Sequence, residues 1–116
     1  MYRVKICGIT TPADALLAAA AGADAIGLNF FSGSPRCVDT ERAGQIIERL
    51  RQDYAPSQVQ VFGVFVNATV DEILRTIRAA KLDGVEQGFG IQLHGDEPPE
   101  LLRELQQIPI VRALRP

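Results

Sequence analysis

Several short apolar runs in this sequence end in a polar or reactive side chain, and the first of them ends in a cysteine. Val4 and Ile6 precede Cys7, and Thr11 then opens a stretch typical of a helix. The partial positive charge at a helix N-terminus stabilises a neighbouring anion and so favours the thiolate form of a cysteine. Cys7 is therefore a candidate nucleophile or general base. The alternative is an inert cysteine that closes a core strand.

Other apolar runs end in unlike polar groups. Asn29 precedes a loop that contains Arg36, Asn67 ends a later run, and Gln92 and His94 end another. Taken singly, each residue has a simpler interpretation: Arg36 as a solvated arginine, Asn67 as a turn residue and His94 as a structural histidine. Gln92 stands between apolar neighbours, so its side chain points to the opposite face of a strand from theirs. If that face is buried, the amide needs a partner or a ligand.

Size and charge limit the classes of function. The chain has 116 residues, 47% of them hydrophobic and 22% charged, which fits a single globular domain. The net charge is −2 and the basic residues are scattered, which argues against a nucleic-acid partner or an anionic membrane surface. No apolar run approaches the roughly 20 residues of a membrane helix, and no secretory signal pattern begins the chain.

The two cysteines indicate neither a disulfide framework nor a metal site. Cys7 and Cys37 are far apart in the sequence and lack a CxxC or histidine partner. Unpaired cysteines fit a reducing cytosol, so a cytoplasmic location is expected. Cys37 follows a loop and is assigned no role.

The elements that would position these residues alternate between strand and helix. Strands are predicted over residues 4–6, 25–30, 59–66, 89–94 and 110–114. Helices are predicted from a Thr11 cap to Ala21, from Asp39 or Thr40 to about Arg51, after a capping box at 69–72, and after Pro98 and Pro99. Near-continuous apolar strands indicate a parallel sheet whose strands are covered.

Two α/β architectures fit this alternation: an open doubly wound sheet and part of a (β/α)8, or TIM-type, barrel. No glycine-rich phosphate motif favours the first. In a barrel the carboxyl ends of the strands converge on one face that carries the active site, which explains why each strand ends in a different polar group. The sequence therefore favours a parallel TIM-barrel type, truncated after about five strands and four helices.

The chain resembles the phosphoribosylanthranilate isomerase family. The resemblance rests on VKICGIT at 4–10, GLNFFSGSPR at 27–36, VFGVFVN at 61–67 and QLHG at 92–95. It implies an isomerase of tryptophan biosynthesis that needs no cofactor or metal and converts N-(5-phosphoribosyl)anthranilate to 1-(2-carboxyphenylamino)-1-deoxyribulose 5-phosphate by an Amadori rearrangement. It also implies that Cys7 is the general base and that Arg36, Gln92 and His94 contact the phosphorylated sugar–anthranilate substrate.

Part of such a site has no counterpart here. A complete barrel needs about 200–250 residues, so residues 1–116 are expected to form a single partial barrel domain without the C-terminal strands. The resemblance implies an aspartate acid on the next strand and a phosphate site after the last two strands, and none of those positions exists in this chain. Helix capping explains the aspartates at predicted helix starts, which are Asp14, Asp39, Asp71 and Asp96.

The sequence departs from the family pattern at one place. Members usually run almost directly from a Leu-Asp pair into QLHG, whereas Leu82-Asp83 is separated from Gln92 by residues 84–91, which include three glycines. This predicts a loop or bulge ahead of the fourth strand.

A partial barrel has unpaired edge strands and an inner face expected to be open to water. We therefore expect the isolated chain to be inactive, and to aggregate, self-associate or require complementation by a C-terminal half. Two other functions stay open: a non-catalytic barrel remnant or interaction module, and an isomerase of another sugar phosphate.

Overall fold

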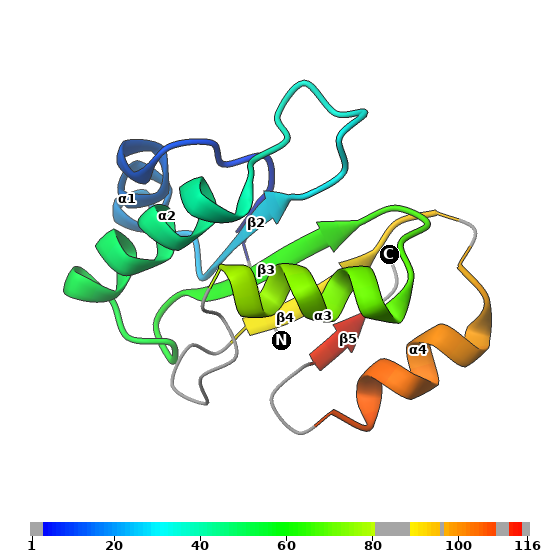
Figure 1. Ribbon diagram of the computed structural model, residues 1–116. Helices are drawn as coiled ribbons and strands as arrows, with labels where there is room; N and C mark the ends of the chain where they lie inside the picture. The colour runs from blue at the N-terminus through cyan, green and yellow to red at the C-terminus, as the bar shows by residue number, and fades with distance from the viewer. Residues whose placement is uncertain (1–3, 81–88, 96, 109–111, 115–116) are drawn as a thin grey trace.

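Strands and helices alternate along the whole described part of the chain. The computed structural model describes residues 4–80, 89–95, 97–108 and 112–114. The elements, in chain order, are β1 (Lys5–Ile6), α1 (Pro12–Ala20), β2 (Ala25–Asn29), α2 (Thr40–Asp53), β3 (Gln60–Phe65), α3 (Val70–Ala79), β4 (Phe89–Leu93), α4 (Pro99–Gln106) and β5 (Arg112–Leu114) (Figure 1). Within these residues the strands form a five-stranded parallel sheet in the order β1-β2-β3-β4-β5.

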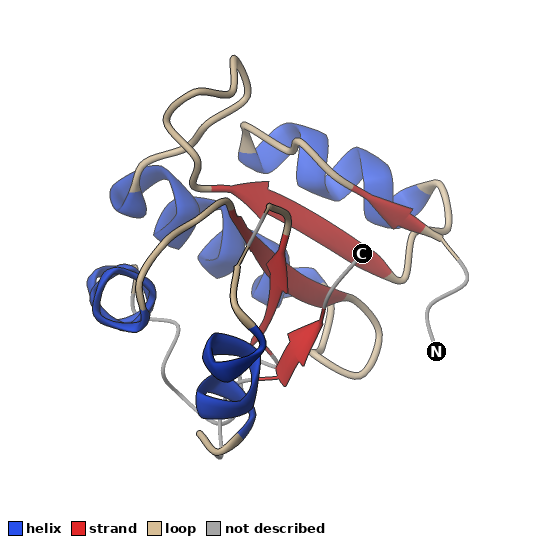
Figure 2. Ribbon diagram, turned by 90° about the vertical axis from the view of Figure 1, so that its right-hand side faces the viewer, coloured by secondary structure: helices blue, strands red, loops and turns tan. Residues whose placement is uncertain are grey.

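The arrangement of the helices decides between the two architectures. Each helix packs beside the next one in the chain, α1 against α2, α2 against α3 and α3 against α4. The helices form one layer along the convex side of a curved sheet (Figure 2). A doubly wound fold would place helices on both faces of the sheet. Sequential strand order with one helix layer is the beginning of a (β/α)8 barrel, and the predicted fold class is confirmed.

Local capping sets the starts of three helices. The side chains of Thr11, Asp39 and Thr69 accept hydrogen bonds from backbone N–H groups three residues later, at 3.1, 2.7 and 3.1 Å. Thr69 also donates its hydroxyl to the Glu72 carboxylate at 3.2 Å, a bond between side chains that differs from the reciprocal bond of a capping box, in which the carboxylate accepts the N-cap N–H. Helix α4 differs because Pro98 is its N-cap residue and offers no side-chain acceptor. These bonds satisfy N–H groups that the first helical turn leaves without partners.

The main core lies between the sheet and the helix layer. Side chains from alternate positions of β2, β3 and β4 pack there against the apolar stripes of the helices. The fully buried members include Ile26, Leu28, Val61, Ile91, Leu93, Ile46, Leu50, Ile73, Ile77 and Leu105. Burial of such a side chain stabilises the fold by about 1.5–3 kcal/mol. This packing holds the strands in register and so fixes where their carboxyl ends lie.

The other face of the sheet is the concave, inner one. Paired residues of parallel strands point to the same face, and the pairings Lys5–Ala25–Gln60 and Gly27–Phe62 place Lys5 and Phe62 on that face. Phe62 is fully buried, and the Lys5 ammonium lies 4.8 Å from its ring centroid. The expectation of an inner face open to water is therefore wrong at the middle strand, because the curved sheet and long side chains such as Lys5 cover it.

Some predicted boundaries fall outside the described residues. The glycine-containing insertion at 84–88 and the start of the last predicted strand at 110–111 lie outside them. From Phe89 onward β4 is regular, since it pairs with β3 without interruption from Val61–Phe89 to Phe65–Leu93. Gln92 therefore occupies a defined place in the sheet.

Candidate active site

Cys7 lies at the carboxyl end of β1, above a glycine of the neighbouring strand. The N–H groups of Gly8 and Ile9 both donate to the carbonyl of Gly27, at 3.1 and 3.2 Å, and hold the chain after Cys7 against β2. A Cβ built on Gly27 would lie only 3.1 Å from the Cys7 Sγ. The thiol thus occupies space that a side chain at position 27 would take, and Cys7 is exposed at the open end of the sheet.

Arg36 reaches this position from the β2–α2 loop. A Cβ on Gly8 would lie 2.8 Å from the Arg36 Cδ and 3.0 Å from its Nη1, so the arginine side chain packs on the Gly8 backbone. Gly8 has a φ of +79°, a conformation that glycine adopts without strain. The loop is held in part by the Arg36 N–H, which donates to the Ser34 Oγ at 3.2 Å. The structure therefore brings Arg36 onto the residue that follows Cys7.

Gln92 faces the same inner side of the sheet. It pairs with Val64, which pairs with Asn29, two positions beyond Gly27 on β2. The Gln92 Oε1 is buried, and no hydrogen-bond partner for it lies among the described residues. A buried carbonyl oxygen without a partner costs about 1–3 kcal/mol. Such an atom is typical of a place where a ligand or water binds.

His94 lies two positions after Gln92, on the same face and at the rim. Its backbone N–H donates to the Phe65 carbonyl at 2.9 Å, which extends the pairing of β3 and β4 by one residue. The side chain is exposed. All four residues singled out from the sequence therefore lie at or near the carboxyl ends of β1, β2 and β4, and Arg36 packs on the residue that follows Cys7.

Sequence reasoning missed one buried acid at this end of the sheet. Glu97 lies in the loop between β4 and α4 and is only 4% exposed. Its Oε2 accepts a hydrogen bond from the Asn67 N–H at 2.7 Å. The sequence analysis assigned no role to Glu97, and no sequence signal pointed to a partner thirty residues earlier.

The second cysteine has a different environment. Partial burial of its sulfur, and to a lesser extent the Asp39 carboxylate, raise the pKa of Cys37 above its ordinary value. Its S–H donates to the Val38 carbonyl at 3.7 Å. A thiol with a raised pKa is a poor nucleophile near neutral pH.

Two further features bear on the class of site. Across the described ranges, no group of three or more histidine, cysteine or acidic residues is placed to hold a metal ion. In the same part of the chain, no helix combines the length and apolar character needed to cross a bilayer.

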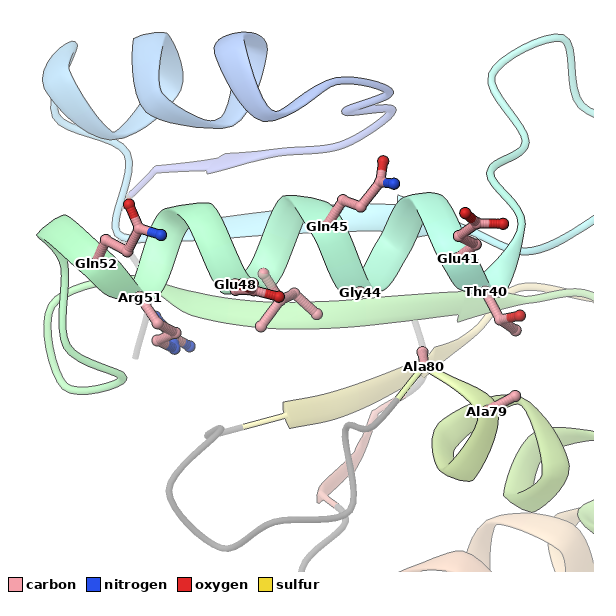
Figure 3. A pocket seen from close by; sticks show the side chains of 10 residues that line it. Thr40, Glu41, Gly44, Gln45, Glu48, Arg51, Gln52, Ala79 and Ala80 are labelled. Carbon is pink, nitrogen blue, oxygen red and sulfur yellow. The ribbon is translucent and has the colours of Figure 1, made fainter.

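A cavity of about 610 Å³ lies away from the four residues, on the helix side of the sheet. It is bordered by one side of α2 and by the end of α3 (Figure 3). Arg51, which lines it, donates to the Val59 and Tyr54 carbonyls at 2.8 and 3.4 Å and so links α2 to the start of β3. None of Cys7, Arg36, Gln92 and His94 lines this cavity, so we do not assign it to the candidate active site.

Comparison with known proteins identifies the family. The family model described as N-(5'-phosphoribosyl)anthranilate (PRA) isomerase matches residues 4–116. The chain belongs to this family. The N-(5'-phosphoribosyl)anthranilate isomerase of Rubrobacter xylanophilus is 46% identical over 117 aligned residues, which cover 99% of this chain and 52% of that protein.

Solved PRA isomerases share the fold. The crystal structure of the Thermotoga maritima protein is 37% identical, with a TM-score of 0.81, and the match covers 99% of this chain and 50% of that one. A PRA isomerase in complex with reduced 1-(o-carboxyphenylamino)-1-deoxyribulose 5-phosphate is 36% identical, with a TM-score of 0.79 and coverage of 99% and 53%. The chain thus spans about half the length of the PRA isomerases it matches.

Proposed function

We propose that this chain forms the N-terminal half of a PRA isomerase active site, with Cys7 as the general base and Arg36, Gln92 and His94 as substrate-binding groups. The observation that supports the proposal is that the Cys7 Sγ packs on Gly27 while the Arg36 side chain packs on Gly8, the residue that follows Cys7. The buried Gln92 Oε1, on the same face of the sheet, adds a polar atom suited to a ligand.

The proposed reaction is an Amadori rearrangement of N-(5-phosphoribosyl)anthranilate. A general acid protonates the furanose ring oxygen, the bond between that oxygen and C1 breaks, and a protonated imine forms. The Cys7 thiolate then removes the proton from C2, which the adjacent imine has acidified. The electron pair of that C–H bond forms the C1–C2 double bond of an enolamine, and the imine nitrogen becomes an amine. Tautomerisation of the enolamine gives the ketone 1-(2-carboxyphenylamino)-1-deoxyribulose 5-phosphate.

Each binding group has a chemical task in this scheme. The Arg36 guanidinium can hold the anthranilate carboxylate through two parallel hydrogen bonds or stack on the aromatic ring. Its place beside Gly8 would put the anthranilate next to the base. The Gln92 amide and the exposed His94 imidazole would hydrogen-bond the opened sugar from the neighbouring strand end.

The rest of the site would come from a C-terminal half. Residues 1–116 would then be one partial barrel domain, and the added strands would contribute the acid and the phosphate site. The small-molecule substrate is the partner we infer for the site, and no cofactor takes part in the scheme. Both cysteines are free thiols, which suits a reducing compartment, and we place the reaction in the cytoplasm.

A chimera tests the proposal directly. Residues 1–116 are joined to the C-terminal half of the Rubrobacter xylanophilus enzyme, and conversion of N-(5-phosphoribosyl)anthranilate is followed by chromatography. We expect turnover by the chimera and none by the 116-residue chain alone. Cys7→Ala should lower kcat by about 10²–10⁴-fold, the usual contribution of a general base, whereas Cys37→Ala should leave kcat unchanged.

Three outcomes would contradict the proposal. An unchanged kcat in Cys7→Ala would show that Cys7 is not the general base. If a folded chimera converts only a different sugar phosphate, the fold is as proposed but the substrate assignment is wrong. A folded chimera without any isomerase activity would favour a non-catalytic remnant.

A further inference from the structure

The buried carboxylate of Glu97 has no part in the reaction scheme, yet it lies two residues after the end of the QLHG segment. We propose that Glu97 is a positioning residue: it ties the β4–α4 loop to the β3–α3 loop and thereby fixes where Gln92 and His94 meet the substrate. This inference rests on the proposed function, because it assigns Glu97 to the substrate-binding groups of that reaction.

The contact itself joins two loops that are distant in the sequence. The Glu97 Oε2 accepts a hydrogen bond from the Asn67 N–H at 2.7 Å, and Glu97 is only 4% exposed. A bond from an N–H to a carboxylate is about twice as strong as one between neutral groups, and burial strengthens it further. Asn67 has a φ of +52°, in the left-handed region that asparagine tolerates better than most residues. That backbone conformation occurs at the same residue whose N–H Glu97 holds.

Gly95 shows how tightly the two loops meet. A Cβ at this position would lie 2.9 Å from the Asn67 Oδ1, 3.2 Å from the Glu97 Oε2 and 3.2 Å from the Val66 Cγ1. Gly95 is exposed, but the direction in which a side chain would project is occupied by the β3–α3 loop and by the Glu97 carboxylate. Only glycine fits there without movement of one of these groups.

This cluster adjoins the proposed binding groups. The His94 N–H donates to the Phe65 carbonyl at 2.9 Å, and the next residue is Gly95, which packs against Asn67 and Glu97. The strand pairing fixes Gln92 and His94 from one side, and the contact between Glu97 and Asn67 fixes the chain that follows them. Without an acceptor oxygen at position 97, the loop after His94 would lose this hydrogen bond to the β3–α3 loop.

The experiment uses the active chimera with three substitutions at one position. Glu97→Gln keeps a carbonyl oxygen that can accept the Asn67 N–H, Glu97→Ala removes the acceptor, and Glu97→Asp keeps the charge but shortens the reach. We expect Glu97→Ala and Glu97→Asp to raise KM about 10-fold, the scale expected of misplaced binding groups. Their kcat should change far less, and Glu97→Gln should stay near the parent values.

Two controls separate positioning from chemistry and from general stability. Cys7→Ala should lower kcat, whereas the Glu97 variants should mainly raise KM. Glu100→Ala removes an acid from the same region, but one that is exposed and paired with Arg103 at 3.7 Å. It should alter neither KM nor kcat.

A second measurement does not depend on activity. Amide hydrogen exchange should show the Asn67 N–H protected in the parent chimera and in Glu97→Gln, and exchanging at least 10-fold faster in Glu97→Ala. If the folded chimera has no isomerase activity, the proposed function fails while this measurement still tests the contact. Unchanged KM in a folded Glu97→Ala protein, or an equally protected Asn67 amide, would overturn the inference. If Glu97→Ala does not fold, a Glu97→Asp protein near parent values beside an impaired Glu97→Gln protein would overturn it.

Discussion

Two glycines make room for the side chains of Cys7 and Arg36. Gly27 leaves room for the thiol, and Gly8 leaves room for the arginine side chain and turns the backbone at φ +79°. Neither glycine has a part in the proposed reaction, yet each adjoins a residue to which the proposal gives one. We therefore expect the proposed site to be sensitive to small changes at these two positions.

A methyl group at position 27 should displace the thiol. In Gly27→Ala the new Cβ would lie 3.1 Å from the Cys7 Sγ and 3.4 Å from the Cys7 Cα, so the sulfur must move by a few tenths of an ångström. Misplacement of a reacting group by about 1 Å can cost on the order of 10²-fold in rate, and we expect kcat of the chimera to fall roughly 3- to 30-fold. Steady-state kinetics and circular dichroism would show a loss of rate with the fold retained.

Gly44→Ala is the matched control for that substitution. A Cβ there would meet only the Ala80 carbonyl oxygen at 3.4 Å, and α2 gains a better helix former. Its kcat should equal that of the parent. A similar loss of kcat in both variants would show that the thiol position is not the cause.

Part of the site could be predicted from the sequence because side chains at strand ends follow from local patterns. Cys7, Gln92 and His94 each end an apolar run, and parallel strands bring such ends to one edge. The role of Glu97 could not be predicted, because its partner Asn67 lies in another loop and the contact forms only after both strands pair. The contact of Arg36 with Gly8 depends on the path of a loop, which no periodicity describes.

At the scale of elements, helix starts were predictable where a side chain makes the cap. Thr11, Asp39 and Thr69 each cap the helix predicted to follow them. The predicted strand ends differ from the observed ones by one or two residues, because pairing with a neighbour decides which residues join the sheet. The link between α2 and β3 was not predicted at all, since it depends on Arg51 reaching backbone carbonyls beyond its own helix.

Arg51 should stabilise the junction of α2 and β3. Burial lowers the pKa of its guanidinium from the ordinary value, and Nη1 donates to the Val59 carbonyl at 2.8 Å. Hydrogen bonds of charged groups contribute about 1.5–3 kcal/mol, so Arg51→Ala should lower the free energy of unfolding by roughly that amount. Urea unfolding of the chimera measures the change.

Arg49 provides the comparison on the same helix. Its ion pair with Asp53 spans 3.1 Å, and the two side chains are 41% and 51% exposed. Exposed pairs contribute about 0–1 kcal/mol, so Arg49→Ala should have a much smaller effect. Equal losses of stability in the two variants would assign the effect to the helix surface and not to the link with β3.

At the scale of the whole molecule, the order of strands followed from the alternation of elements, but the shape of the sheet did not. Sequential parallel strands need helical crossovers, and the sequence supplies one between each pair. Curvature arises from packing of the helix layer and twist of the strands, and it buries Phe62 on a face expected to be open to water. Within the described residues, β1 and β5 are the two edge strands of the sheet.

These two edges predict association of the 116-residue chain with itself. An edge strand presents N–H and C=O groups ready to pair with another chain. The β1 edge also carries exposed apolar side chains, since Val4 is 46% and Ile6 is 36% exposed, and Leu17 on α1 is 67% exposed. At micromolar concentration, sedimentation should give a mass of at least a dimer for the isolated chain. Addition of the C-terminal half of a PRA isomerase should replace that species with a one-to-one complex.

Charge at the edge distinguishes strand pairing from contact through the helix face. Ile6→Lys places a charge on β1, where edge charges oppose strand addition, and should shift the isolated chain toward monomer. Leu17→Lys places the same charge on α1 and should leave the mass unchanged if the edges drive association. A monomeric parent chain over the whole concentration range would contradict the prediction. Monomer formation by Leu17→Lys alone would assign the association to the face of α1 instead.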